Sequence, residues 1–152
     1  MSELLVDFIT SLDGYGAAEG WPGTEELASL PKIVMSTTLT APLSWPNTRL
    51  VAEDAVEAVR TMKDDGTTSL RTMGSLTLCR SLLSAGLVDR FRVVVFPVIT
   101  GSTGRERIYD GYPDVSLDLV SSRTFDGRLQ LLEYVPTVLA GPPGATEAQD
   151  RP

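Results

Sequence analysis

The residues best suited to chemistry in this chain are Thr72-Met73-Gly74-Ser75-Leu76, between a short run of strand formers and a helical pattern. A strand, a glycine turn and a helix gather backbone N–H groups and the positive end of the helix macrodipole at one point, which suits a phosphate. Gly74 permits close approach of a ligand to the backbone, and Ser75 adds a hydroxyl donor. An ordinary strand-to-helix turn explains the same residues equally well, so the local pattern leaves both interpretations open.

A second polar group follows the strand expected over residues 32–36. Ser36, Thr37 and Thr38 offer three hydroxyls that suit the ribose or 2′-phosphate of an adenine dinucleotide through neutral hydrogen bonds. Hydroxyl residues after a strand more often form simple turns or caps, and that alternative stays open here.

Asp13 is the carboxylate best placed to contact a proton or a substrate, because it ends the first expected strand and leads into a loop. An Asx turn at Asp13-Gly14 explains it equally well. The glycine-rich loop that follows carries Tyr15 and Trp21, aromatic side chains that are costly to leave exposed. We therefore expect this loop to cover a ligand.

Composition limits the chemistry. Cys79 is the only cysteine and histidine is absent, which excludes an internal disulfide, a histidine-based triad and the usual zinc sites, so we expect no metal. A net charge of -7 without a basic cluster opposes nucleic-acid binding. The longest apolar stretch, residues 93–99, is far shorter than the roughly 20 residues that span a membrane. The first residues resemble no secretory signal, so we expect a cytoplasmic protein.

One α/β domain is expected from 152 residues. The continuous apolar run at 93–99 predicts a central strand covered on both faces, and Asp126-Gly127 predicts a hairpin between the last two strands. Residues 105–107 are expected in a solvated loop, and residues 136–152, rich in proline, glycine and alanine, in a flexible tail. The expected strands cover residues 4–10, 32–36, 48–51, 69–73, 89–99, 115–123 and 128–135, and the helices cover residues 54–65 and 76–85.

Taken in order, these segments resemble the dihydrofolate reductase-like fold, in the branch of the reductase domain of bacterial riboflavin biosynthesis and its stand-alone relatives. The resemblance implies a mixed, mostly parallel sheet flanked by helices, with a C-terminal antiparallel hairpin, over residues 1–135. It rests on Phe8-Ile9-Thr10-Ser11-Leu12-Asp13-Gly14, on Lys32-Ile33-Val34-Met35-Ser36-Thr37-Thr38-Leu39, on Gly74-Ser75-Leu76-Thr77-Leu78, and on Gly86-Leu87-Val88-Asp89-Arg90-Phe91 followed by Phe96-Pro97-Val98-Ile99-Thr100-Gly101.

The resemblance also implies an NADPH-dependent reductase that transfers hydride to a small heterocyclic or carbonyl-bearing substrate, with Asp13 nearest the reacting centre. A cofactor-free small-molecule-binding or tailoring protein on the same fold is the alternative. A homodimer is a further expectation, in which the segment 115–135 pairs or packs between subunits. NADPH would place its adenosine near Ser36, Thr37 and Thr38, its pyrophosphate over Thr72, Met73, Gly74, Ser75 and Leu76, and its nicotinamide near Leu12, Ile99 and Gly101, with the substrate facing Leu12, Asp13, Tyr15 and Trp21.

The chain departs from these relatives at two places. Ser75 stands where they usually have a second glycine. They also place a helix, a strand and a Gly-x-x-Thr motif where this chain has only residues 23–31, and such a unit needs on the order of 30 residues. Either one wall of the site is lost, or a segment around Gly23-Thr24 is omitted from the sequence as given. We favour the second, because deleting a strand from within a sheet exposes unpaired backbone and apolar surface.

Overall fold

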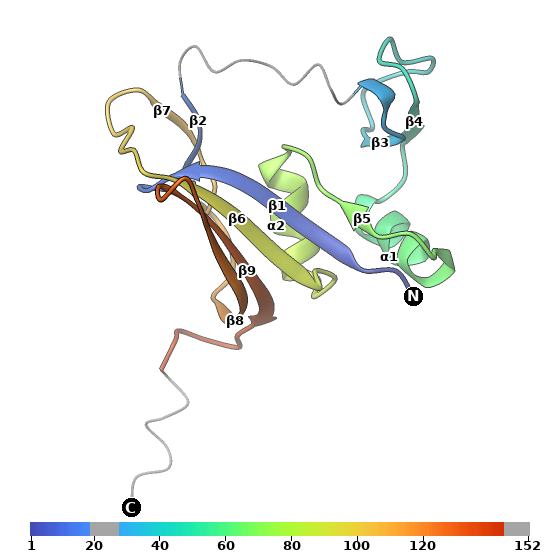
Figure 1. The fold of residues 1–152 in the computed structure, drawn as a ribbon. Helices are drawn as coiled ribbons and strands as arrows, with labels where there is room; N and C mark the ends of the chain where they lie inside the picture. The colour runs from blue at the N-terminus through green and yellow to red at the C-terminus, as the bar shows by residue number, and fades with distance from the viewer. Residues whose placement is uncertain (19–27, 145–152) are drawn as a thin grey trace, which may run out of the picture.

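The computed structural model describes residues 1–18 and 28–144 (Figure 1). A five-stranded sheet forms the body, in the order β5-β1-β6-β9-β8. Its strands are β1 (Leu4–Ser11), β5 (Leu70–Arg71), β6 (Arg90–Phe96), β8 (Val115–Phe125) and β9 (Leu129–Val138). There are also two short strand pairs among the described residues: β2 (Tyr15–Ala18) pairs with β7 (Gly104–Arg107), and β3 (Lys32–Met35) pairs with β4 (Thr48–Val51). The two helices are α1 (Ala55–Asp65) and α2 (Leu76–Ser84).

The sheet is mixed, as predicted. β1 pairs in parallel with β5 and β6, whereas β9 pairs antiparallel with β6 and β8. Parallel pairs therefore make up half of the pairings rather than most of them. The predicted C-terminal hairpin is present, and its turn residues Asp126 and Gly127 have φ angles of 51° and 65°. Two successive positive φ angles are the geometry that favours Asp-Gly in tight hairpins.

The core lies on one face of this sheet. Leu4, Val6 and Phe8 alternate along β1 and pack against both helices, as the period of two in a strand requires. Cys79 of α2 is buried in the same cluster, as its place on an apolar stripe predicted. The remaining buried members are Val59, Leu82, Leu83, Leu87, Val88, Phe91, Val93 and Ile108.

Both helices begin and end within one residue of the predicted positions. Asp54 caps α1 by accepting a hydrogen bond from the Glu57 N–H at 3.0 Å, and Ser75 caps α2 by accepting one from the Leu78 N–H at 3.3 Å. Gly86 follows α2 with a φ of 68°, the left-handed geometry of a carboxyl-end glycine. Neither helix of the described chain is long and apolar enough to cross a membrane.

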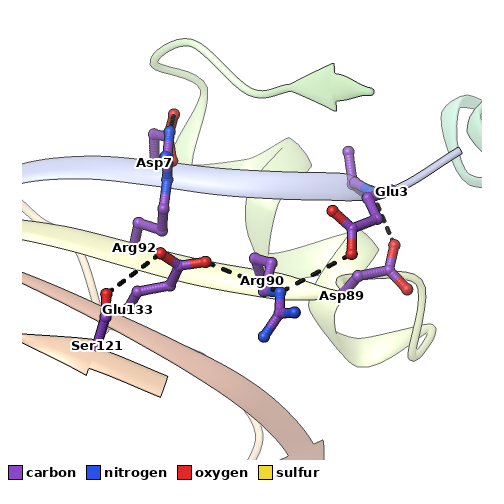
Figure 2. Close-up of polar contacts among 8 residues, drawn as sticks. Glu3, Asp7, Asp89, Arg90, Arg92, Ser121 and Glu133 are labelled. Carbon is purple, nitrogen blue, oxygen red and sulfur yellow. Dashed lines mark hydrogen bonds and ion pairs between the residues drawn. The ribbon is translucent and has the colours of Figure 1, made fainter. Parts of the chain in front are cut away.

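The opposite face of the sheet carries a row of ion pairs (Figure 2). Arg92 binds both carboxylate oxygens of Asp7 at 2.6 Å, and Arg90 lies 3.9 Å from Glu3 and 3.8 Å from Glu133. The prediction that the strand within residues 89–99 is covered on both faces was wrong. Phe91 and Val93 face the core, whereas the other face of β6 begins with Arg90 and Arg92, whose charged groups stay partly solvated. Within the apolar run itself, Val94 and Phe96 are only partly buried, and Val98 and Ile99 lie beyond the strand and are exposed.

A buried lysine ties three elements together at the amino end of β6. The Lys63 ammonium donates to the Asp89 carboxylate at 2.5 Å and to the Leu87 carbonyl at 2.6 Å. The same oxygen of Asp89 accepts from the Leu4 N–H at 2.7 Å. A buried ammonium is costly unless it is paired, so Asp89 stabilises the position of Lys63 near the end of α1. By accepting from the Leu4 N–H, the same carboxylate also fixes the start of β1.

Several boundaries differ from prediction. The segment 15–18, predicted as loop, forms β2, and the loop predicted over 105–107 belongs to β7. Strands of four residues with glycine carry no alternation that a sequence would reveal. β9 continues through Pro136 to Val138, past the predicted start of the tail, while residues 145–152 of that tail lie outside the described residues.

Candidate active site

The strands β1, β5 and β6 are neighbours and run parallel, so their carboxyl ends point to the same side of the sheet (Figure 1). β1 and β6 end side by side at Ser11 and Phe96, whereas β5 ends earlier, with Arg71 opposite Leu5. Leu12 and Asp13 follow β1, Met73 and Gly74 follow β5, and Ile99 lies shortly after β6. Predicted site residues from two distant parts of the sequence, after β1 and after β6, therefore meet at this edge, and the turn after β5 lies on the same side of the sheet further back along β1. Open α/β sheets bind ligands at this position.

The loops after β1 and β6 are hydrogen-bonded to each other. The Leu12 N–H donates to the Val98 carbonyl at 2.8 Å, and the Thr100 N–H donates to the Asp13 carboxylate at 3.1 Å. Gly101 is so close that a Cβ built on it would lie 3.9 Å from Asp13 Oδ2. The two segments that were predicted to surround a nicotinamide are thus adjacent.

Asp13 is an exposed carboxylate held by two hydroxyl residues that the sequence reasoning missed. The Ser11 hydroxyl donates to Asp13 at 2.6 Å, and the Thr100 hydroxyl donates to the Ser11 oxygen at 3.3 Å. The hydrogen bond from Ser11 is the largest cause that lowers the pKa of Asp13, and the Thr100 N–H lowers it further. Asp13 is therefore ionised at neutral pH, where it accepts hydrogen bonds and is a poor proton donor. The Ser-Leu-Asp spacing was the signal that could have found Ser11.

The turn before α2 is open to solvent and left-handed at two successive residues. Gly74 has a φ of 71° and Ser75 a φ of 34°. A Cβ on Gly74 would meet nothing within 4 Å, so space lies beside the turn. Ser75 adopts a left-handed conformation that glycine reaches at less cost, and its hydroxyl caps the helix. The N–H groups of Leu76 and Thr77 lie in the first helical turn, where the helix itself offers no acceptor.

The other residues predicted around this turn differ in what they expose. Thr72 is buried, its N–H donates to the Leu5 carbonyl at 3.0 Å, and its hydroxyl accepts from the Asp7 N–H at 3.3 Å. The side chain of Thr72 is therefore engaged by β1 and is not presented at the edge. Leu76 packs against the core, so only its backbone is available, whereas the Met73 side chain is exposed.

Large apolar side chains are exposed at the same edge. Ile99 is 74% exposed and Leu12 is 67% exposed. Val98, whose carbonyl accepts the hydrogen bond from the Leu12 N–H, is exposed as well. Apolar groups of this size seldom gather at a surface without a binding role. They offer a nonpolar surface for a flat ring.

Tyr15 lies in the β2–β7 pair that continues from the Asp13 turn. The Arg107 guanidinium lies 5.6 Å from the centre of the Tyr15 ring and 3.3 Å from Asp110, whose charge is the largest cause that raises the pKa of Arg107. Tyr15 is therefore a fixed aromatic group next to the edge. Trp21, the other aromatic residue predicted to face a substrate, lies outside the described residues.

Ser36, Thr37 and Thr38 follow β3, which is not part of the main sheet. The Ser36 hydroxyl oxygen accepts from the Thr38 N–H at 3.2 Å and from the Leu39 N–H at 3.1 Å, which is the local turn that the sequence left as an alternative. Among the described residues β3 pairs only with β4, and β5 pairs only with β1. The predicted adenosine side therefore lies on a separate ribbon, which contacts the core through Met35.

Comparison with known proteins agrees with this arrangement. The model of the RibD C-terminal domain matches residues 19–131. The chain is 26% identical over 84 residues to the uncharacterized protein YyaP of Bacillus subtilis strain 168. The match covers 55% of this chain and 44% of that relative, so the chain spans less than half of the relative's length.

Two solved structures have the same fold. RibD of Acinetobacter baumannii superposes with a TM-score of 0.68 at 14% identity, covering 90% of this chain and 58% of that one. A pyrimidine reductase-like protein of Corynebacterium diphtheriae superposes with a TM-score of 0.64 at 13% identity, covering 90% and 92% of the two chains. The expected dihydrofolate reductase-like fold is confirmed, and the chain belongs to the RibD C-terminal domain family.

Proposed function

We propose that this chain is an NADPH-dependent reductase that transfers hydride to a small heterocyclic or carbonyl-bearing substrate. One observation carries the proposal: an open helix-start turn at Gly74 and the exposed apolar loops around Leu12 and Ile99 follow parallel strands of one sheet, on the side to which their carboxyl ends point. The turn suits a phosphate and the apolar loops suit a flat ring, and a dinucleotide contains both groups. Arg71 at the end of β5 opposes Leu5, so the turn lies further back along β1 than the apolar loops, and the cofactor would run along the sheet from one to the other.

The residues present fit the nicotinamide half of such a cofactor. The open side of Gly74 and the N–H groups of Leu76 and Thr77 would hold the pyrophosphate, since a helix start favours anions. Leu12 and Ile99 would bury the faces of the nicotinamide and exclude water. When bound, the reduced nicotinamide supplies the hydride.

Asp13 orients the substrate in this proposal. Its ionised carboxylate is held in place by Ser11 and Thr100, so it can accept a hydrogen bond from an N–H group of a heterocycle. Its lowered pKa makes it unsuitable as the proton donor at neutral pH. The relatives' names support the substrate class, because one solved relative is described as pyrimidine reductase-like.

A cofactor-free binding protein on the same fold is the second candidate. It is favoured by the separation of β3 from the main sheet, which leaves Ser36 to Thr38 on a ribbon of their own. Such a protein would keep the apolar edge and Asp13 for a small ligand without needing the adenosine side.

Thermal unfolding with and without NADPH separates the two. A cofactor at 100 times its dissociation constant should stabilise the chain by about 2.7 kcal/mol. Gly74→Ala should abolish this stabilisation, because the added Cβ enters the open side of the turn. The same measurement with NADH, which lacks the 2′-phosphate, tests whether that phosphate contributes to binding.

Gly127→Ala is the matched control. Gly127 also has a positive φ, 65°, and a Cβ there also meets nothing within 4 Å, but it lies in the β8–β9 turn. Each alanine should cost about 1–2 kcal/mol of stability through left-handed backbone strain, and only Gly74→Ala should remove the response to NADPH. A wild-type chain that shows no shift with either nucleotide would refute the reductase proposal and leave the cofactor-free candidate.

A further inference from the structure

The loops that follow the three parallel strands carry a single charge. These loops cover residues 11–18, 72–79 and 97–104, and Asp13 is the only charged residue in them. In the described part of the chain its carboxylate makes no ion pair. Its hydrogen-bond donors are the Ser11 hydroxyl and the Thr100 N–H, which are both neutral. Asp13 is therefore a negative charge that no neighbouring cation of these loops balances.

The adjoining β2–β7 pair does not supply the missing positive charge. Arg107, which opposes Tyr15, lies 3.3 Å from the Asp110 carboxylate. Residues 105–110 contain two arginines, one glutamate and one aspartate, so the charges of this segment cancel. The sequence between Asp13 and Lys32 contains no lysine or arginine and adds no positive charge either.

One oxygen of Asp13 is left for a ligand. Oδ1 accepts from the Ser11 hydroxyl at 2.6 Å and from the Thr100 N–H at 3.1 Å, whereas Oδ2 has only the same Thr100 N–H, at 3.2 Å. An ionised carboxylate oxygen can accept more than one hydrogen bond, so Oδ2 keeps acceptor capacity. A ring lying over the exposed Leu12 and Ile99 would meet this oxygen.

We propose that this edge takes a substrate that is neutral or positively charged and donates N–H groups to Asp13, and that it excludes substrates with a phosphate or carboxylate group there. The inference rests on the proposed reductase function and names its substrate class. An anionic group near Asp13 would face a like charge without a cation to neutralise it, which opposes association. The net charge of -7 adds repulsion over a longer range.

The phosphates of a dinucleotide are compatible with this selectivity. They would bind at the Gly74 turn, where helix N–H groups are available and where residues 72–79 contain no carboxylate. The turn lies further back along β1 than Asp13, because Arg71 opposes Leu5. The side of the sheet that suits phosphate and the side that rejects it are thus separate.

Charged thiol reagents measure the potential at the edge without any nucleotide. Ile99→Cys places an exposed thiol next to Thr100, and the native Cys79 is buried. The probes are two methanethiosulfonates, one ending in a sulfonate and one in a trimethylammonium group. The thiolate attacks the thio sulfur of either probe, a disulfide forms, and methanesulfinate leaves. The ratio of the two rates cancels the intrinsic reactivity of the thiolate, because both probes share it.

Leu39→Cys is the matched control. Leu39 is also an exposed apolar residue, and residues 36–46 around it contain no charge. At low salt the preference for the cationic probe should be about tenfold greater at Ile99→Cys than at Leu39→Cys. The excess should shrink between about 10 mM and about 150 mM salt, as the screening length falls from about 30 Å to about 8 Å.

Adding Asp13→Asn to Ile99→Cys isolates the charge. The preference should then fall to within about twofold of the Leu39→Cys value. Equal preferences at the two positions, or a preference at Ile99→Cys that persists with Asp13→Asn, would overturn the proposal. Failure of the wild type to bind NADPH is a separate result, since the labelling needs no cofactor.

Pairs of heterocyclic aldehydes that differ only in a phosphate test the selectivity for substrates, beginning with pyridoxal and pyridoxal 5′-phosphate. Hydride from NADPH adds to the aldehyde carbon, a proton from water completes the alcohol, and the loss of NADPH absorbance reports the rate. In each pair that is reduced, the member without phosphate should have a kcat/KM at least about tenfold higher. Faster reduction of the phosphorylated member would overturn the proposal.

Discussion

The five-stranded sheet and the β3–β4 ribbon are both built from strands that the sequence indicates, yet they are held in the molecule in different ways. The sheet packs Val6 and Phe91 against two helices and is fastened at one end by the Lys63–Asp89 pair. The ribbon contacts the same core through Met35, and in the described part of the chain its strands pair only with each other.

Among the described residues β5 and β3 each pair on one side only. The helix and strand that the family resemblance led us to expect would stand between the first loop and β3, where the sequence has only residues 23–31. The proposed nicotinamide half of the site is thus carried by the body, and the proposed adenosine half by the ribbon. Changes in the body should act on the whole fold, and changes in the ribbon should stay local.

The largest expected effect is on the body, at Asp89. Asp89→Ala leaves the buried Lys63 ammonium with the Leu87 carbonyl alone and removes the acceptor of the Leu4 N–H. It should lower the free energy of unfolding by about 3 kcal/mol, a drop of roughly 6–12 °C in Tm.

Lys63→Met is the companion change, because it removes the charge and keeps much of the apolar stem. It should cost clearly less than Asp89→Ala, since no unpaired buried charge remains. Thermal unfolding followed by circular dichroism measures both, and an equal loss for the two variants would contradict the role given to Asp89.

A middle-sized effect is expected in the ribbon, at Met35. Met35→Ala should cost about 1–2 kcal/mol locally, because this partly buried side chain holds β3 to the core. Hydrogen exchange should then speed up at the amides of β3 and β4, with the amides of β1 and β6 unchanged. Ile33→Ala, at an exposed position of the same strand, is the control and should change neither set. Faster exchange throughout the sheet would show that the ribbon and the body are one cooperative unit.

The smallest effect is expected at Asp13, on the edge of the body. Because the folded-state pKa of Asp13 is lowered from 3.8, its contribution is present above that value and is lost as the pH falls through the folded-state pKa. The difference in Tm between wild type and Asp13→Asn should therefore be small at neutral pH and vanish in acid. Ser36→Ala, in the hydroxyl turn of the ribbon, should show no such pH dependence. A difference for Asp13→Asn that grows in acid would contradict the assignment.

Local signals predicted much of the fold. Helix caps and tight turns depend on interactions within a few residues, so they can be predicted without the tertiary structure. The examples here are the caps at Asp54 and Ser75, the glycine after α2 and the Asp126-Gly127 turn. The positions of the site loops followed from the same signals, since each loop comes directly after a strand.

Contacts between residues far apart in the sequence could not be predicted from these local signals. Asp13 was identified as the important carboxylate, but Thr100, which contributes to its lowered pKa, lies 87 residues away. Thr72 was grouped with Gly74 by proximity, and only the pairing of β5 with β1 shows that its hydroxyl is engaged inside the sheet. The β2–β7 pair escaped prediction for the same reason, because each strand is too short to be stable without the other.

The sequence by itself determined both helices with their caps, the strands of the main sheet in their order, and the family to which that order belongs, because these features depend on contacts between near neighbours. Only the tertiary structure decided that one face of the sheet bears ion pairs, that Lys63 is buried against Asp89, and that the β3–β4 ribbon does not pair with the five-stranded sheet. These outcomes depend on which distant segments lie side by side, and that is set by the packing of the whole chain.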